Sequence, residues 1–392
     1  MASLYERLGG LDAITAVIDS FVARCAGDDR INAKFARTDI PRLKKMLVDQ
    51  VCEASGGPCT YTGRSMKETH NGMAVTAGEF DALVEDLVAT LDEFGVPRTE
   101  RDEFRFERYL GLPDSIEIHL KTEWVNPGGS IKDRTALSII GSALAIGELA
   151  PGRTLIDATS GNTGIAYAML GAALEIPVTL VVPESASDER KRTLVAYGAN
   201  VVYSDPYEGS DGAIRLVRET VAGDPDRFFY ADQYTNPANT AAHFMTTGPE
   251  VWRQTAGALT HFVAALGTTG TLMGAGQYLR GLAPIQLVGV QPAEAFHGIE
   301  GLKHLPTAIV PGIFDSSVPD RIEGIETDEA FDAARALARV EGYFAGSSTG
   351  ANLAAVARLG SELAKEGRAG RIVVIGCDGG SRYLTTGLWH FD

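Results

Sequence analysis

From Ser115 onward, short apolar runs alternate with segments of helical spacing, and this alternation constrains the fold more than any other feature of the chain. The runs have the length and the β-branched composition of buried strands. They are TLIDA at 154–158, PVTLVV at 177–182, NVVY at 200–203, HFVAA at 261–265, QLVGV at 286–290 and RIVVI at 371–375. Such alternation predicts an α/β fold with a largely parallel sheet, whose ligands bind at the carboxyl ends of the strands.

The first hundred residues follow a helical pattern instead. Apolar side chains recur at helical spacing at Ile14, Val17, Ile18, Phe21 and Val22, and again at Phe80, Leu83, Val84, Leu87 and Leu91. Glycine-containing turns separate the two stretches. We therefore expect an all-α domain over residues 1–100, a helical connector over 101–114, and a region of two α/β subdomains over 115–392.

Charge and cysteine usage exclude several classes of protein. The chain carries 35 basic and 51 acidic residues, a formal net charge of −16, so an acidic surface would repel nucleic acid and anionic membranes. The N-terminal stretch lacks the pattern of a signal peptide. The four cysteines show neither a disulfide framework nor C-x-x-C spacing. We expect reduced cysteines and a cytoplasmic protein without a zinc site.

Three predicted strands lead into turns of small, hydroxyl-bearing residues that begin a helix. They are TSGNTG at 159–164, GTTGT at 267–271 and GSSTG at 346–350. Because a helix N-terminus offers free N–H groups, three such turns together favour a ligand with several anionic or polar groups. The third turn also fits G-x-S-x-G, which would make Ser348 the nucleophile of a serine hydrolase. No oxyanion-type segment precedes it, and that alternative leaves the other turns unexplained.

A lysine occupies the start of another predicted helix, in the sequence NPGGSIKDR at 126–134. Most lysines are solvated surface charges. At a helix N-terminus the helix dipole lowers the affinity of the amine of Lys132 for a proton, and a neutral amine is what Schiff-base chemistry requires.

With this lysine motif, the region from about residue 115 to 392 resembles the cysteine synthase branch of fold-type II pyridoxal-phosphate enzymes, and most of all the cysteine synthase B group. The resemblance rests on ordered motifs: NPGGSIKDR, TSGNTG, QYTNPAN at 233–239, TTGPEVW at 246–252, GTTGTLMG at 267–274 and CDGGSRYLTTG at 377–387. It implies a homodimeric transferase with pyridoxal 5'-phosphate as cofactor.

The resemblance also implies a role for each matching residue. Lys132 would hold the cofactor covalently and then remove the substrate Cα proton. Asn162 would bind the ring hydroxyl of the cofactor, and Ser348 its pyridine nitrogen. The cofactor phosphate would lie against Gly267, Thr268, Thr269, Gly270 and Thr271. The substrate carboxylate would be held by Thr159, Ser160, Thr163 and Gln233.

A hydroxyl at Ser348 leaves the pyridine nitrogen unprotonated, which disfavours transamination and suits β-elimination followed by addition. The implied substrates are an O-activated L-serine, either O-acetylserine or O-phosphoserine, and sulfide or a related nucleophile. The segment GIEGLKH at 298–304 replaces a more basic stretch of cysteine synthase B, so the sequence leaves the leaving group open.

The N-terminal half resembles group I truncated haemoglobins over residues 4–97. The matching motifs are YERLGG at 5–10, GGPCTYTG at 56–63, MKETH at 66–70 and GVP at 95–97. The resemblance implies haem b with His70 as the proximal iron ligand and Phe35 against the haem. Val22 and Leu47 stand at the distal side, which predicts an apolar pocket for a diatomic gas.

Two functional hypotheses follow for the whole chain. The first is a β-replacement enzyme with a haem-globin module that regulates it. The second is a haem-based gas or redox sensor with a vestigial synthase domain. The presence of Lys132, Asn162 and Ser348 together favours the first, because a binding relic needs none of them.

Overall fold

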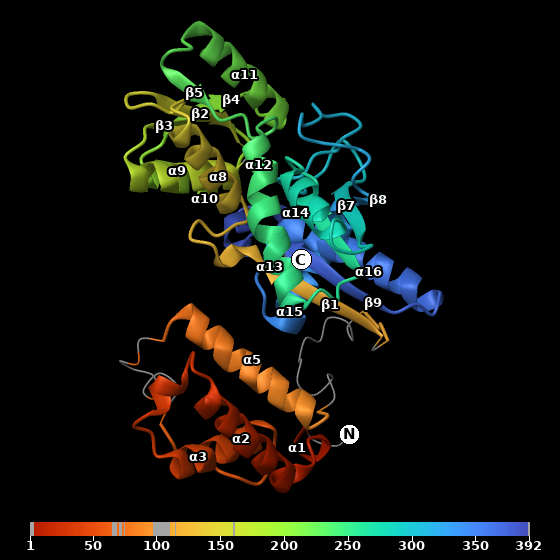
Figure 1. Ribbon diagram of the computed structural model, residues 1–392. Helices are drawn as coiled ribbons and strands as arrows, with labels where there is room; N and C mark the ends of the chain where they lie inside the picture. Colours follow the sequence, from red (N-terminus) through yellow and green to blue (C-terminus); the bar gives the residue numbers. More distant parts are fainter. Residues whose placement is uncertain are drawn as a thin grey trace. The chain divides into compact units, whose positions relative to one another are not determined.

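The computed structural model describes residues 4–64, 69, 73, 75–96, 110–113, 115–159 and 161–390. The chain forms two compact units, Met1–Phe104 and Arg105–Asp392, both drawn in Figure 1. Most of the predicted connector over 101–114 lies outside the described residues. Within the described ranges, no helix is both long and apolar enough to cross a bilayer.

The N-terminal unit is helical. Its elements are α1 Leu4–Arg7, α2 Gly10–Gly27, η1 Asn32–Phe35, α3 Ile40–Ala54 and α5 Ala77–Glu93. Side-chain caps fix where two of them begin. The carboxylate of Asp39 accepts a hydrogen bond from the backbone N–H of Arg42 at 3.1 Å at the start of α3. At the start of α5, Thr76 and Glu79 form a reciprocal capping box.

The core of this unit lies between the helices. On α2, Ile14, Ile18 and Val22 are buried, as the helical spacing predicts. On α5 the described side chains that are buried include the polar Asp86 and Thr90, whereas Val84 and Leu87 are exposed. The helix is confirmed, but its buried face carries smaller and more polar residues than the apolar spacing suggests.

The expectation of reduced cysteines is wrong for two of the four. Cys52 and Cys59 form a disulfide with their Cα atoms 5.7 Å apart, while Cys25 and Cys377 are free. Cys52 lies near the end of α3. In the turn that follows, the N–H of Gly57 donates a hydrogen bond to the carbonyl of Cys52 at 2.7 Å. This reversal of the chain brings Cys59 back to Cys52, a pairing that no spacing rule for disulfide frameworks identifies.

The C-terminal unit is built of strands and covering helices. Its strands are β1 Ile116–Thr122, β2 Thr154–Ala158, β3 Val178–Pro183, β4 Asn200–Ser204, β5 Phe228–Tyr230, β6 His261–Ala265, β7 Gln286–Pro292, β8 Arg321–Ile325 and β9 Gly370–Gly376. The α-helices are α8 Lys132–Ala145, α9 Asn162–Leu174, α10 Asp188–Ala196, α11 Gly209–Gly223, α12 Pro237–Ala242, α13 Gly248–Gln254, α14 Gly270–Arg280, α15 Thr327–Glu341 and α16 Ser347–Lys365. Short helical turns are η2 Glu123–Val125, η3 His243–Thr247, η4 Gly380–Tyr383 and η5 Gly387–Trp389.

These strands form two parallel sheets. One has the order β1-β9-β6-β7-β8 and the other β4-β3-β2-β5. All six runs that the sequence marks as buried strands form strands, β2, β3, β4, β6, β7 and β9, but β4 is largely exposed because it lies at the edge of its sheet. The remaining strands, β1, β5 and β8, are more polar or shorter, and the apolar runs alone do not reveal them.

Helices cover both faces of the smaller sheet (Figure 1). Leu155 of β2 packs in a core with α8 and α9, whereas the next residue, Ile156, packs in a core with α11. Successive strand residues point to opposite faces, so a strand that is apolar throughout is buried on both. The carboxyl ends of β2 and β6 lead into the turns at 159–164 and 267–271, as expected, and β9 leads into the motif at 377–387. The expectation of a strand before the turn at 346–350 is wrong, because this turn follows α15 and an isolated bridge at Ala345.

Candidate active site

Lys132 is the first residue of α8, and the loop before it is held in place by its own side chains. Gly129 has a positive φ of 75°, and the Asp133 carboxylate accepts a hydrogen bond from the N–H of Gly128 at 2.5 Å. The N–H of Ile131 donates to the carbonyl of Cys377 at 2.9 Å, which ties this loop to the end of β9. The loop geometry thus places the lysine beside Cys377.

The amine of Lys132 has a shifted protonation equilibrium. Removal from water lowers the pKa of Lys132 below its ordinary value, and the nearby carboxylate of Asp378 counteracts only part of this effect. The lowered pKa increases the fraction of neutral amine near neutral pH. A neutral amine is the form that attacks a carbonyl carbon.

The turn after β6 forms a cradle for an anion. Thr268, Thr269 and Thr271 are buried, and Thr269 adopts a left-handed conformation with φ of 71° immediately before α14. A Cβ at Gly267 would lie 2.3 Å from the carbonyl oxygen of Gly301, and only glycine fits there. The hydroxyl of Thr269 is buried without a hydrogen-bond partner in the described part of the chain.

The turn after β2 is shaped by its own hydroxyls. The Thr159 hydroxyl accepts hydrogen bonds from the N–H groups of Gly161 and Gly164 at 3.1 and 3.0 Å. Thr163 donates to Oε1 of Gln233 at 2.7 Å, and Gln233 Nε2 donates to the carbonyl of Ala158 at 2.7 Å. Three of the four residues predicted to hold a carboxylate are thereby brought together. The fourth, Ser160, lies outside the described residues.

Asn162 begins α9 and is oriented by the end of β9. Its amide nitrogen donates to Oδ2 of Asp378 at 2.7 Å, and the same oxygen accepts from the Tyr383 hydroxyl at 2.7 Å. Arg382 donates to the amide oxygen of Asn162 and to the carbonyl of Gly128. Asp378, Arg382 and Tyr383 belong to the motif CDGGSRY, yet residue type alone gives no indication that they orient Asn162.

Asn239 is a second positioning residue that the sequence did not reveal. Its amide nitrogen donates to the Thr268 hydroxyl at 2.9 Å and to the carbonyl of Gln233 at 2.8 Å. Thr135 donates to its amide oxygen at 3.1 Å. Its place at the end of the motif QYTNPAN was the sequence signal that could have identified it, and the structure shows that it is fully buried.

Ser348 lies at the start of α16 next to Cys377. Burial raises the pKa of the Cys377 thiol to about 12, with a smaller contribution from Asp378, while a hydrogen bond with Ser348 acts in the opposite direction. A thiol with this pKa is protonated at neutral pH and does not serve as a base for the Ser348 hydroxyl. This thiol therefore does not supply the base that a hydrolase nucleophile needs within hydrogen-bond reach.

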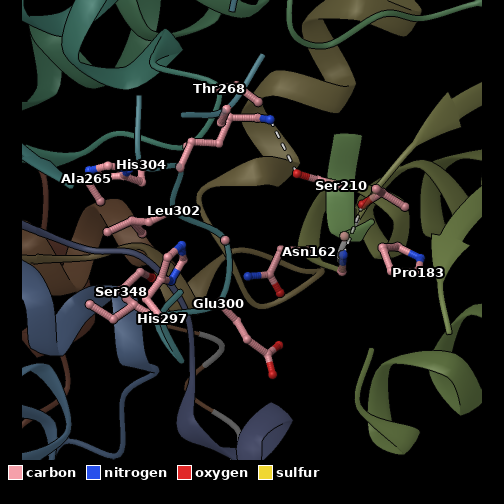
Figure 2. A pocket seen from close by; sticks show the side chains of 18 of the residues that line it. Asn162, Pro183, Ser210, Ala265, Thr268, His297, Glu300, Leu302, His304 and Ser348 are labelled. Carbon is pink, nitrogen blue, oxygen red and sulfur yellow. Dashed lines mark hydrogen bonds between the residues drawn. The ribbon is translucent and has the colours of Figure 1, made fainter. Parts of the chain in front are cut away.

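All of these turns open into one cavity of about 720 Å³. Figure 2 shows Asn162, Thr268, Ser348 and Glu300 around it. Its lining includes Lys132, Thr159, Asn162, Thr163, Gln233, Gly267, Thr268, Thr271, Ser348 and Cys377. The volume is within the usual range for a cofactor or small-molecule site, about 300–1,000 Å³.

The arrangement fits pyridoxal phosphate. The cavity offers an amine with a lowered pKa, an anion cradle at the N-terminus of α14 that contributes Gly267, Thr268 and Thr271, and an oriented amide. Residues 104–378 match the family described as pyridoxal-phosphate dependent enzyme. The chain belongs to this family.

Known members of the family resemble the chain closely. It is 53% identical over 279 residues to a cysteine synthase of Aquifex aeolicus, covering 71% of this chain and 85% of that protein. Identity to cysteine synthase B of Pseudomonas aeruginosa is 44% over 286 residues, covering 73% and 93%. The crystal structure of O-acetyl serine sulfhydrylase isoform 3 from Entamoeba histolytica matches with a TM-score of 0.66 and 37% identity, covering 72% and 85%. The C-terminal unit is a cysteine synthase-like pyridoxal-phosphate enzyme of fold-type II.

The N-terminal unit matches a second family. Val22 of α2 is buried, and Leu47 of α3 packs against the same apolar cluster. Phe35 lies in the neighbouring cluster with Cys25 and Ile31. Residues 3–108 match the bacterial-like globin family, so the chain joins a globin to a pyridoxal-phosphate enzyme. His70, the predicted iron ligand, lies outside the described residues.

Proposed function

We propose that the enzyme half catalyses β-replacement on an O-activated L-serine, either O-acetylserine or O-phosphoserine, with sulfide or a related nucleophile. The observation that carries this proposal is the convergence of Lys132, the 267–271 cradle and the 159–164 turn on one cavity. The names of the cysteine synthase relatives support the same reaction class.

The cofactor supplies an electron sink for the bonds at the Cα and Cβ atoms of the substrate amino acid. Lys132 would hold the cofactor covalently, and its Nζ, once released, would take the Cα proton. The lowered pKa of Lys132 suits both tasks, because each requires the neutral amine. Gly267, Thr268, Thr269, Gly270 and Thr271 would hold the cofactor phosphate.

Three side chains would fix the rest of the cofactor and the substrate. Asn162, oriented by Asp378, would bind the ring hydroxyl, and the neutral hydroxyl of Ser348 would face the pyridine nitrogen without protonating it. The substrate carboxylate would lie against the 159–164 turn, where Thr159, Ser160 and Thr163 lie next to Gln233. That turn also precedes the N-terminus of α9, where the helix dipole favours an anion.

Two alternatives receive less support. A gas or redox sensor with a vestigial synthase has no need for Lys132, Asn162 and Ser348 on the same cavity, yet all three line it. A serine hydrolase would need a base beside Ser348, whereas Ser348 lies against a protonated thiol.

For the globin half we propose haem b held by His70, with Val22 and Leu47 forming an apolar distal side toward a diatomic gas. Their packing in one apolar cluster supports the distal assignment. A haem unit fused to an enzyme suggests that haem state regulates the synthase. A Soret band in the purified protein that His70→Ala abolishes would support haem binding, and a spectrum without that band would contradict it.

We further propose a cytoplasmic homodimer. Large apolar side chains are exposed on and near α8 and η3, namely Leu137, Ile146, Phe244 and Met245, and their exposure supports self-association. Light scattering of the purified protein tests the dimer, and cell fractionation tests the location.

The decisive experiment for the proposed reaction is a substrate screen. Cofactor-loaded protein is given O-acetylserine or O-phosphoserine with sulfide, thiosulfate, cyanide or amines, and the amino-acid products are identified by mass. Cysteine or a cysteine analogue from at least one pair supports the proposal. Turnover of none of the pairs would contradict it.

A further inference from the structure

Two buried cations line the cavity beyond the proposed cofactor residues, and each is already paired with a carboxylate. The guanidinium of Arg190, on α10, forms an ion pair with Glu300. The ammonium of Lys303 lies 2.6 Å from Oδ1 of Asp211, on α11. The side chains of Arg190 and Lys303 are only 3% and 5% exposed, so neither cation is free to bind solvent anions.

Packing holds both cations in place. A Cβ at Gly161 would lie 2.5 Å from Cδ of Arg190, and the guanidinium stacks over the ring of Tyr383 at 4.6 Å. Lys303 also donates to the Ser210 hydroxyl at 3.3 Å. The second oxygen of Asp211 accepts from the N–H of Ile309 at 2.9 Å, which fixes the carboxylate beside Lys303. Figure 2 shows Glu300 and Ser210 on different sides of the cavity.

The two ion pairs have opposite polarity. Glu300 and Lys303 both come from the segment 298–304 between β7 and β8. Glu300 pairs with a cation on α10, whereas Lys303 pairs with a carboxylate on α11. Besides Lys132, which the cofactor would occupy, the described lining holds two permanently charged cations, Arg190 and Lys303, and the imidazoles of His297 and His304. Against them it holds three carboxylates, those of Glu208, Asp211 and Glu300.

Both permanently charged cations are therefore already paired, and neither is left for a second dianion next to the cofactor phosphate. A phosphate ester beside these buried cations would have to displace a carboxylate or accept like-charge repulsion. The acetyl group of O-acetylserine carries no charge, so it neither displaces a carboxylate nor is repelled by one. The segment 298–304 is less basic than the matching stretch of cysteine synthase B, and for that reason the sequence alone does not identify the leaving group.

We infer that Glu300 and Asp211 are specificity-determining residues that neutralise Arg190 and Lys303 and so select O-acetyl-L-serine over O-phospho-L-serine. This inference rests on the proposed β-replacement. The leaving group is then acetate, because Arg190 and Lys303 bind carboxylates of the protein and not an anionic group of the substrate.

The test compares kcat/KM for the two substrates at a fixed sulfide concentration, using the cofactor-loaded full chain. The wild-type protein is expected to favour O-acetylserine. Glu300→Gln frees Arg190 and is expected to raise the kcat/KM ratio of O-phosphoserine to O-acetylserine by roughly 10-fold or more, the size of a charge-assisted hydrogen bond. Asp211→Asn, which frees Lys303, is expected to change the ratio in the same direction.

Glu208→Gln is the matched control. Glu208 lines the same cavity but pairs at 2.9 Å with Arg215, and both side chains are more than half exposed. The variant removes the same charge without freeing a buried cation, so its ratio should change by less than about 3-fold. Equal changes in Glu300→Gln and Glu208→Gln would overturn the inference, because they would reveal only a general effect of net charge.

A binding readout complements the rates. Removing Glu300 leaves a buried guanidinium unpaired, and inorganic phosphate can replace the lost carboxylate. Phosphate is therefore expected to raise the thermal midpoint of the Glu300→Gln holoenzyme more than that of wild type, at equal ionic strength. Equal shifts would contradict the inference.

The outcomes separate this inference from the proposed function. Cysteine formation from O-phosphoserine at an equal or higher kcat/KM in wild type would overturn the inference and leave β-replacement intact. Absence of cysteine from both substrates would overturn the proposed function and the inference with it.

Discussion

The amide nitrogen of Asn239 lies 2.9 Å from the hydroxyl of Thr268 and so connects the anion cradle to the substrate side of the cavity. The same nitrogen donates to the backbone carbonyl of Gln233, whose side chain binds Thr163. One buried side chain thereby sets the position of both groups.

Asn239→Ala is expected to weaken cofactor binding by about 10- to 100-fold, because a buried hydroxyl and carbonyl lose their donor. Equilibrium dialysis of the cofactor measures the effect. Asn236→Ala is the matched control, since Asn236 caps α12 through the N–H of Ala238 and makes its other bond to the carbonyl of Ala231. Equal loss of cofactor in both variants would show that Asn239 acts only through stability.

Ser348→Asp is expected to slow β-replacement by roughly 100-fold, since a carboxylate would favour a protonated pyridine nitrogen where the wild type has a neutral hydroxyl. Ser348→Ala keeps the site neutral and should be affected far less. A serine-directed fluorophosphonate distinguishes the hydrolase alternative. Labelling of Ser348 by that reagent would refute its assignment to the cofactor.

Asp157, fully buried at the end of β2, predicts a pH dependence of stability. Removal from water raises the pKa of Asp157 from 3.8 to about 8, although the N–H groups of Ala158 and Gln233 oppose the shift. The folded chain thus keeps a proton that the unfolded chain releases between these pH values. This carboxyl makes the free energy of unfolding fall as pH rises through that window.

Asp157→Asn, which cannot titrate, is expected to remove this component of the slope. Urea unfolding of both proteins at several pH values between about 4 and 9 measures it. Asp224→Asn, at the exposed end of α11, controls for loss of one charge. Identical slopes in wild type and Asp157→Asn would show that Asp157 is ionised in the folded chain throughout.

The regulatory role of the globin makes a separate prediction. A coupling of about 1–3 kcal/mol between haem state and substrate binding would change the apparent substrate affinity roughly 5- to 150-fold. The β-replacement rate is measured with ferric, ferrous and ferrous–CO iron, and again in His70→Ala. Equal rates in all four samples would mean that the globin does not regulate the enzyme.

Much of the fold follows from local sequence pattern. The buried strands are mostly apolar, and glycine-containing turns mark where β2 and β6 deliver Thr159 and Gly267 to the cavity. These features depend on residues close together in the chain, and periodicity and turn chemistry report on such residues. Lys132 is placed at the start of α8 for the same reason.

What the sequence did not reveal depends on distant pairs. Asn162 is oriented by Asp378, 216 residues further along the chain, and Arg190 of α10 pairs with Glu300 from the segment between β7 and β8. Each of these residues alone looks like an ordinary polar or charged side chain. The Cys52–Cys59 disulfide was missed for a local reason, since its closure depends on the backbone path of a Gly-Gly-Pro turn.

The account as a whole depends on Lys132 as the residue that holds the cofactor. The most direct measurement is borohydride reduction of the cofactor-loaded protein, followed by proteolysis and mass spectrometry of the modified peptide. We predict that the cofactor mass is found on Lys132 alone, and that Lys132→Ala retains its fold but neither the label nor turnover. A label on another lysine, or full activity in Lys132→Ala, would contradict the account.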